Sequence, residues 1–317
     1  MKIDSDPTKW LPKTSALQLQ KPDVVFFAGA IRPWDEAVLH VSSEAVLRGL
    51  NVFEGLKGYW QHDGEFALRS LQRHYGRLVR SARLLHIPVP VSYEQFENAC
   101  FEITRAVYRP ENDLYVRATL FVIAGHWGEG SVADLVLTAY QQDSAPPAPV
   151  DVGVSTWRRP VDLAMPARIK TSTNYQVARL ARIEGRSRGY EDMVLLNQAD
   201  RVAEATAACV LLVRDGAVIS PPAYEGALES ITVQMVADLC ASLGIEFSRR
   251  PIERSELHIA DELGLAGTLC EVTQIRSIDG TGLPEAPVLK AIESRYRDAV
   301  RGSDPHPRVE LDVLPSR

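Results

Sequence analysis

The segment Met165-Pro-Ala-Arg-Ile-Lys170-Thr-Ser-Thr-Asn-Tyr175 places a lysine between a largely apolar stretch and a run of small hydroxyl residues that opens a predicted helix. A lysine taken alone is most often a solvated surface cation. The neighbours of Lys170 are what favour a functional amine at this position. The choice depends on what else the chain supplies for a buried cation.

Two downstream segments offer groups of that kind. In Val202–Ala208, Glu204 is an acid within a small, apolar predicted strand. An unpaired buried charge is costly, so Glu204 either pairs with one of the many arginines or serves a buried cationic ligand. The segment Ala227–Thr232 begins a helix, whose free amides favour an anion, although Ser230 or Glu229 as a simple N-cap is the more common case.

Hydrophobic patterning predicts alternating strands and helices on both sides of these segments. Strands are expected at 24–31, after Pro33 at Ala37–Val41, and at 114–125, 133–140 and 270–278; a hairpin is expected across Asp63-Gly64 between 55–60 and 65–69. The apolar stripe Tyr75, Leu78, Val79, Ala82, Leu85 predicts a helix. Further helices are expected at 92–108, 175–188, 230–243 and 286–301.

The order of these elements predicts α+β domains rather than a doubly wound sheet. Residues 143–150, Asp-Ser-Ala-Pro-Pro-Ala-Pro-Val, form the best linker candidate because three of the eight are prolines. We therefore expect an N-terminal arm at 1–22, a small domain at 23–142, the linker at 143–150 and a larger domain at 151–317.

Composition excludes several classes of protein. The 317 residues are 45% hydrophobic and 24% charged, and 35 Lys and Arg against 41 Asp and Glu give a net charge of -6, so no global basic field attracts nucleic acid or an anionic membrane. No apolar run is long enough to span a bilayer, and the first residues lack the apolar core of a signal peptide. Four widely separated cysteines without metal-ligand spacing predict no metal site and a reducing compartment, the cytoplasm.

Nucleophile elbows, Walker loops and dinucleotide fingerprints are absent from the sequence. Taken together, however, the segments resemble the class IV (fold type IV) pyridoxal-phosphate aminotransferases, most closely the branched-chain amino acid aminotransferases. Seven markers occur in order: NVFEGLKGY (51–59), GRLVRSARLLHIP (76–88), LYVRATLF (114–121), RIKTSTNY (168–175), RVAEATA (201–207), ALESIT (227–232) and AGTLCEVTQIRSIDG (266–280).

This resemblance implies a two-domain fold like that of D-amino acid aminotransferase, with a small N-terminal α/β domain and a larger domain with a mixed, barrel-like sheet. It also implies roles for individual residues. Lys170 matches the lysine that forms the Schiff base with pyridoxal 5'-phosphate, Glu204 the carboxylate facing the ring nitrogen and Tyr175 the tyrosine near the phenolic oxygen. Further matches bind the phosphate (Arg77, Ser230, Ile231, Thr232, Thr268) or line the substrate pocket (Arg48, Phe53, Lys57, Tyr115, Arg117, Leu269, Cys270).

The expected reaction is ping-pong transfer of an amino group between an L-amino acid and a 2-oxo acid such as 2-oxoglutarate. The chain departs from the family pattern in four places: Ala205–Cys209 replaces a glycine-rich segment, Glu229-Ser230 replaces Pro-Gly, Leu269 replaces alanine, and Arg48 and Lys57 make the pocket unusually cationic if they face inward. The expected amino donor is therefore either branched-chain-like or, as these departures favour, a specialised biosynthetic substrate that is polar, acidic or bulky.

Three alternatives remain open at this point. The same fold also supports D-amino acid or amine transamination and a lyase reaction resembling that of aminodeoxychorismate lyase. A non-catalytic paralogue is the third alternative, although the retention of both Lys170 and Glu204 speaks against it. The resemblance further implies a homodimer or higher homo-oligomer, small-molecule substrates, and neither nucleic acid nor membrane as a partner.

Overall fold

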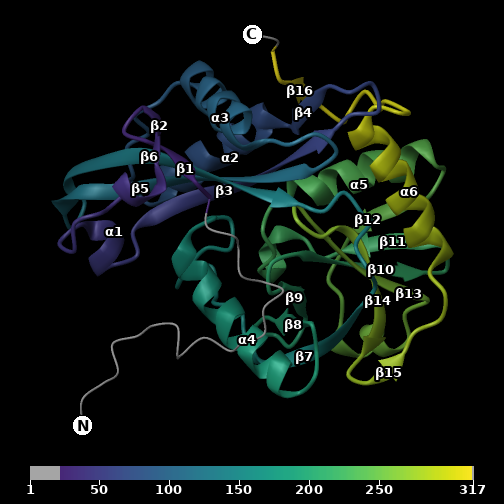
Figure 1. The fold of residues 1–317 in the computed structure, drawn as a ribbon. Helices are drawn as coiled ribbons and strands as arrows, with labels where there is room; N and C mark the ends of the chain where they lie inside the picture. Colours follow the sequence, from purple (N-terminus) through teal and green to yellow (C-terminus); the bar gives the residue numbers. More distant parts are fainter. Residues whose placement is uncertain (1–21, 316–317) are drawn as a thin grey trace.

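Two β-sheets organise residues 22–315, the part of the chain that the computed structural model describes (Figure 1). The expected arm at 1–22 lies almost wholly outside the described residues. The first sheet is antiparallel and has seven strands in the order β16-β4-β3-β5-β6-β1-β2. Their bounds are β1 Val24–Phe27, β2 Ala30–Pro33, β3 Asn51–Trp60, β4 Phe66–Arg69, β5 Asp113–His126, β6 Glu129–Gln142 and β16 Leu311–Val313.

The expected hairpin and the long central strand pair are confirmed. Trp60 of β3 pairs with Phe66 of β4, and Gly64 in the turn has a φ of 88°. The helices α2 (Leu71–Leu84) and α3 (Tyr93–Val107) lie along one face of this sheet (Figure 1). Their apolar stripes pack against the sheet and bury one hydrophobic core. At the N-terminus of α3, Ser92 and Gln95 form a capping box.

One expected strand is wrong. Ala37–Val41 forms no strand; the short 3-10 helix Trp34–Glu36 precedes it and α1 (Glu44–Leu47) follows it. The side chains of Val38 and Val41 are each 71% exposed, so these residues have neither a neighbouring strand nor a core face to pair with. A short apolar run is an ambiguous signal for a strand, because tertiary contacts decide whether it pairs.

The second sheet is mixed and curled, with the strand order β12-β11-β10-β13-β14-β7-β8-β9 and β15 paired to β14. The strands are β7 Val150–Arg158, β8 Asp192–Leu196, β9 Val202–Ala205, β10 Cys209–Arg214, β11 Ala217–Ser220, β12 Phe247–Arg249, β13 Glu262–Gly267, β14 Glu271–Ile278 and β15 Thr281–Gly282. The helices α5 (Ile231–Ser242) and α6 (Pro287–Arg301) bury a second core against it, and α4 (Tyr175–Ser187) packs on β7 and β8.

The chain crosses between the sheets through residues 143–149 and returns to the first sheet at its C-terminal end. Strand β16 pairs with β4, and Asp312 Oδ2 accepts a hydrogen bond of 2.8 Å from the amide of Leu71, the first residue of α2. The division into domains stays a prediction. Along the described residues, no helix is long and apolar enough to cross a membrane, and no group of His, Cys, Asp or Glu is arranged to hold a metal ion.

Candidate active site

Lys170 lies in the connection between β7 and α4, where contacts from the first sheet hold its backbone. Its amide donates to Ser81 Oγ of α2 (3.1 Å), and its carbonyl accepts from the amide of Phe53 on β3 (2.9 Å). Because both backbone groups are fixed, the side chain has a defined origin. Its Nζ donates to Tyr175 Oη at 2.8 Å and lies 4.9 Å from the centre of the Phe53 ring.

Glu204 on β9 is held by two donors. Its Oε1 lies 3.2 Å from Arg159 Nη2, and its Oε2 accepts from the amide of Leu228 at 2.9 Å. Arg159 is itself fixed, because it donates to the carbonyls of Gly226 and Asn174. These two contacts fix the orientation of the Glu204 carboxylate.

Arg77 on α2 is buried rather than part of a solvated helix face. Its Nε and Nη2 each donate to one oxygen of Glu54 at 2.7 Å, and its Nη1 donates to the carbonyl of Glu229 at 3.0 Å. A guanidinium held at two edges has a fixed plane, which suits binding of a phosphate or carboxylate.

Glu54 joins Arg77 to His74. Burial alone would raise the pKa of Glu54, but the charge of Arg77 and the hydrogen bonds from Arg77 and His74 together lower it to about 2. Burial lowers the pKa of His74 to about 4 despite its bond to Glu54, so at neutral pH the imidazole is neutral and the carboxylate charged. The buried Nε2 of His74 has no partner among the described residues.

The N-terminus of α5 faces Arg77. Ser230 caps the helix by accepting from the amide of Val233 at 3.2 Å, which leaves the amides of Ile231 and Thr232 free of the cap. The neighbouring Glu229 carboxylate is half exposed and bonds Arg168 Nε at 3.2 Å, so its charge is neutralised away from the helix end. The substitution of Glu229 for the family's proline is therefore compatible with an anion at this helix.

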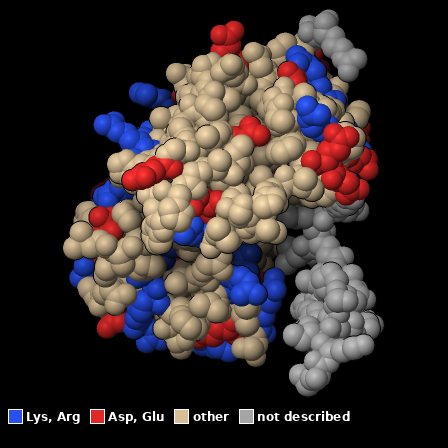
Figure 2. Space-filling view, turned by 90° about the vertical axis from the view of Figure 1, so that its left-hand side faces the viewer, with Lys and Arg blue, Asp and Glu red and all other residues tan. Residues whose placement is uncertain are grey.

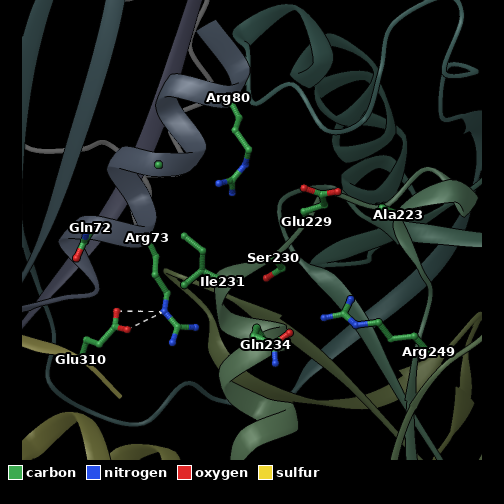
Figure 3. Close-up of a pocket in the computed structure, with 11 residues that line it drawn as sticks. Gln72, Arg73, Arg80, Ala223, Glu229, Ser230, Ile231, Gln234, Arg249 and Glu310 are labelled. Carbon is green, nitrogen blue, oxygen red and sulfur yellow. Dashed lines mark hydrogen bonds and ion pairs between the residues drawn. The ribbon is translucent and has the colours of Figure 1, made fainter. Parts of the chain in front are cut away.

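Figure 3 views the outer side of the same helix start. Arg73 and Arg80 from α2 and Arg249 from β12 extend toward a cavity of about 590 Å³ that Glu229 and Ser230 border. Arg73 is neutralised by Glu310 (3.0 Å), whereas Arg80 has no ion pair among the described residues. Arg80 is thus an unpaired surface arginine close to, but outside, the cavity that holds Lys170.

A small cavity brings together most of the residues that the resemblance singled out for the cofactor. The groups that converge there are an amine, a carboxylate, a guanidinium, a phenol and the start of α5. The lining comprises Arg77, Lys170, Tyr175, Glu204, Ala207, Ala208, Cys209, Leu228, Ser230, Ile231, Thr232, Ala266, Gly267 and Thr268. At its floor, a Cβ added to Gly267 would lie 3.1 Å from Cys270 Sγ and 3.4 Å from the carbonyl of Ala207.

The residues expected at the substrate side fall into two groups. Phe53 packs edge-on against Tyr175 (5.1 Å between ring centres), and the Arg117 guanidinium lies 3.7 Å from the Phe53 ring centre. Tyr115 is buried, and burial raises its pKa against the opposing charge of Arg117. These three residues lie on one side of Lys170.

The other expected pocket residues lie elsewhere or at the rim. Lys57 Nζ is buried between Glu271 Oε1 (2.7 Å) and Asp113 Oδ2 (3.5 Å), while Arg48 bonds Glu44 (2.6 Å) and covers the ring of Trp127 at 4.4 Å. Thr268 lines the small cavity, and Leu269 beside it is 50% exposed. Burial raises the pKa of the adjacent Cys270 thiol to about 12.

Three residues in these contacts were missed by sequence reasoning. Glu54 lies within the apolar strand NVFEGLKGY, where an acid is a detectable signal. His74 precedes Arg77 by three positions, the spacing of one helix face, which also indicates a contact. Arg159 carries no local signal, because its partner Glu204 is 45 residues away in the chain.

Comparison with known proteins identifies the family of the chain. The family model of amino-transferase class IV matches residues 51–278. The chain belongs to the class IV aminotransferases. It is 31% identical to the branched-chain-amino-acid aminotransferase of Escherichia coli (strain K12), covering 87% of this chain and 93% of that protein.

Solved structures of class IV aminotransferases share the fold. The branched-chain aminotransferase of Thermoproteus uzoniensis with norvaline aligns with a TM-score of 0.85 at 31% identity, covering 91% of this chain and 98% of its own. The pyridoxal-phosphate form of the enzyme from Thermobaculum terrenum gives 0.84 at 31% identity, covering 93% and 99%. The class IV aminotransferase described here is a transaminase that depends on pyridoxal phosphate.

The donor set fits that cofactor. Lys170 offers an amine of the kind that reacts with an aldehyde, Glu204 a carboxylate that could face a ring nitrogen, and Arg77 with the α5 amides a cation and donors suited to a phosphate. Ala207, Ala208 and Gly267 leave the walls between these groups free of large side chains. The alanines that replace glycines after Glu204 are therefore tolerated in this arrangement.

Proposed function

We propose that the protein transfers an amino group between an L-amino acid and a 2-oxo acid, with Lys170 as the residue that moves the proton. The observation that carries this proposal is the position of Lys170 Nζ, 2.8 Å from Tyr175 Oη, in one cavity with Glu204 and Arg77. The chain's similarity to branched-chain aminotransferases supports the same reaction class.

Each residue contributes in a way that follows from its contacts. Bound pyridoxal phosphate supplies the electron sink that tolerates a carbanion at the substrate Cα. Glu204, held in place by Arg159 and the Leu228 amide, would keep a proton on the ring nitrogen of the bound cofactor and so strengthen that sink. Arg77 and the amides of Ile231 and Thr232 hold the phosphate, with the plane of Arg77 set by Glu54.

Lys170 acts as the base. Its free amine would take the Cα proton of the amino donor and deliver it to C4′ of the bound cofactor, and in the second half-reaction it would carry a proton the other way, to the Cα of the former 2-oxo acid. Tyr175 Oη fixes the direction in which Nζ points. Phe53, Tyr115 and Arg117 form the wall on the substrate side, and the amides at Thr268-Leu269-Cys270 face the α-carboxylate. The α-amino group is thereby oriented toward Lys170.

The test is a half-reaction with single amino donors. Purified protein loaded with pyridoxal phosphate is mixed with L- and D-enantiomers of the same amino acids, and the visible absorbance is followed. The proposal predicts loss of the cofactor band with an L-donor, its recovery on adding a 2-oxo acid, and initial-rate plots that are parallel lines. Reaction with D-donors alone, or release of product without an amino acceptor, would instead indicate the other chemistries of this fold.

We also propose that the protein forms a homodimer. Its support is a group of exposed apolar side chains around α1 and the β5–β6 turn: Val38 and Val41 (71% each), Leu47 (60%) and Trp127 (74%). Contiguous exposed apolar surface commonly marks an interface. Light scattering on the purified protein tests this: twice the 35.1 kDa chain mass supports it, and the chain mass alone contradicts it.

We further propose that the protein is located in the cytoplasm. All four cysteines are free thiols, and three of them are buried. Proteins of oxidising compartments more often use cysteines in disulfides. Fractionation of cells that express the untagged protein measures its location directly.

A further inference from the structure

A second, larger cavity adjoins the site along α4. Its volume is about 680 Å³, and it shares Tyr175 and Ala207 with the lining of the small cavity that holds Lys170. Phe53 and Arg117 stand at the same end. The larger cavity is therefore open to the side chain of a substrate bound at Lys170, and its volume is in the usual size range of a ligand pocket.

All the charged residues that line this cavity are positive. Its lining contains four arginines, Arg117, Arg179, Arg182 and Arg186, and neither an aspartate nor a glutamate. Three of the four come from α4, at positions i, i+3 and i+7, which lie along one helix face. The neighbouring face, with Ala178, Ala181 and Gly185, is the buried one.

These α4 arginines are largely unneutralised. Within the described residues, no ion pair or hydrogen bond involves the side chains of Arg179 and Arg186. Arg182 makes one contact, from Nη2 to Asp192 Oδ2 at 3.3 Å, while its buried Nε has no partner. The other oxygen of Asp192 is occupied by Thr206 Oγ1 at 2.5 Å. The one acid of α4, Glu184, is engaged with Ser155 and Arg188.

This arrangement changes the origin of the expected cationic pocket. Arg48 and Lys57 were the expected sources of extra positive charge, but Glu44 neutralises the first, and Glu271 and Asp113 neutralise the second. The free positive charge comes from α4 instead. Figure 2 views the side of the molecule on which α1 and α4 lie in Figure 1, and shows Lys and Arg side chains gathered on its lower half.

Helix geometry sets the reach that a ligand needs. At about 1.5 Å per residue, Arg179 lies roughly 6 Å, Arg182 roughly 10 Å and Arg186 roughly 16 Å along the axis from Tyr175. Arg179, Arg182 and Arg186 together form an arginine wall. A four-carbon apolar side chain has no group that can bind these guanidiniums, and the side chain of glutamate reaches only Arg179. A longer chain with a terminal anion would meet two or three guanidiniums.

We propose that this cavity binds amino acids or 2-oxo acids longer than glutamate that end in a carboxylate or a phosphate, and that Arg179, Arg182 and Arg186 recognise the distal anion. The proposal rests on the transaminase function above and names its substrate class. Guanidinium groups bind both anions through paired N–H donors, so the shared chemistry is a distal oxyanion.

The first experiment compares donors that differ in one feature. The series L-glutamate, L-2-aminoadipate and L-2-aminopimelate lengthens the chain, L-norleucine removes the distal charge, and L-O-phosphohomoserine replaces carboxylate by phosphate. We expect kcat/KM to rise with the length of the acidic chain, to be at least about tenfold higher for aminoadipate than for norleucine, and to fall for the acidic donors as salt screens the exposed arginines. Whether aminopimelate or phosphohomoserine is the better donor identifies the distal group. Norleucine as the best donor would overturn the proposal.

The second experiment uses variants. The double variant Arg179→Gln/Arg186→Gln should raise KM for 2-aminoadipate about tenfold with a smaller change in kcat. Each exposed ion pair between an arginine and the distal anion is expected to change the binding constant by up to about fivefold. Arg80→Gln removes an unpaired exposed arginine outside the cavity and is the matched control; it should leave KM for every donor unchanged. Equal losses for aminoadipate and norleucine in the double variant would contradict recognition of the anion.

A binding measurement separates this proposal from the proposed function. Adipate has two carboxylates but no amino or oxo group, so calorimetry of adipate against hexanoate reports on the arginine wall without catalysis. We expect adipate to bind more tightly, and the double variant to lose the difference. If adipate binds this way while no donor changes the cofactor band, the transaminase proposal fails and the anion site stands; if donors react but adipate and hexanoate bind alike, the anion site fails.

Discussion

The substitution Glu54→Gln tests the pairing that orients Arg77. Glu54 is fully buried, and both of its oxygens bond Arg77 at 2.7 Å. The variant removes the charge that compensates a buried guanidinium, and breaking such a pair typically costs about 3–5 kcal/mol. The pKa of Glu54 leads to a similar figure, because a fall from 4.5 to about 2 corresponds to about 3 kcal/mol at roughly 1.4 kcal/mol for each pKa unit.

The assay is urea denaturation of the cofactor-free protein at pH 7, followed by tryptophan fluorescence. The matched control is Glu310→Gln, which breaks the exposed ion pair with Arg73 on the same helix and should cost less than about 1 kcal/mol. Added pyridoxal phosphate should stabilise Glu54→Gln more than wild type, because the phosphate replaces the missing negative charge beside Arg77. Equal destabilisation by the two variants, or no extra stabilisation by the cofactor, would refute the role given to Glu54.

Three further predictions concern neighbouring groups. The pKa of His74 is about 4 in the folded protein, against 6.5 for an ordinary histidine, so its contribution to the free energy of unfolding is fully present above pH 6.5 and is lost as the pH falls toward 4. In urea denaturation across this range, the free energy of unfolding of His74→Gln should therefore depend less on pH than that of the wild type. An equal pH dependence in the two proteins would contradict the assignment. In Gly55→Ala the new Cβ would lie 2.7 Å from Tyr115 Oη, so the tyrosine side chain must shift. The KM for amino donors should then rise about tenfold or more in steady-state assays. An unaltered KM would show that Tyr115 does not contact the substrate. Cys209 and Cys240 are buried, and burial raises the pKa of each thiol to about 12. Iodoacetamide at pH 8 should therefore label both far more slowly in the folded than in the urea-unfolded protein, as measured by peptide mass spectrometry; rapid labelling of either would contradict its burial.

Elements with strong local signals were predictable from the sequence. The Asp63-Gly64 hairpin follows from the positive φ that glycine accepts, and the helix around Arg77 from the period of its apolar stripe. Ser230 is both the N-cap and part of the cavity lining, so the two interpretations of its segment are compatible.

Tertiary contacts explain what could not be predicted. Patterning alone assigns Arg77 to a solvated face, because nothing within the helix shows that the buried Glu54 of a neighbouring strand pairs with it. Nor does the sequence around Lys57 show its partners, because Glu271 and Asp113 come from two other strands. Charge in a sequence therefore indicates a cationic pocket only when its distant partners are known, and here the unpaired charge lies on α4.

Borohydride reduction followed by peptide mass mapping tests the central claim most directly. Reduction of the protein loaded with pyridoxal phosphate makes its link to a lysine permanent, so the added mass identifies the residue. The account predicts that the mass lies on Lys170 and is absent from Lys170→Ala. Mass on another lysine, or none after loading, would contradict the assignment of Lys170 as the reactive amine of this aminotransferase.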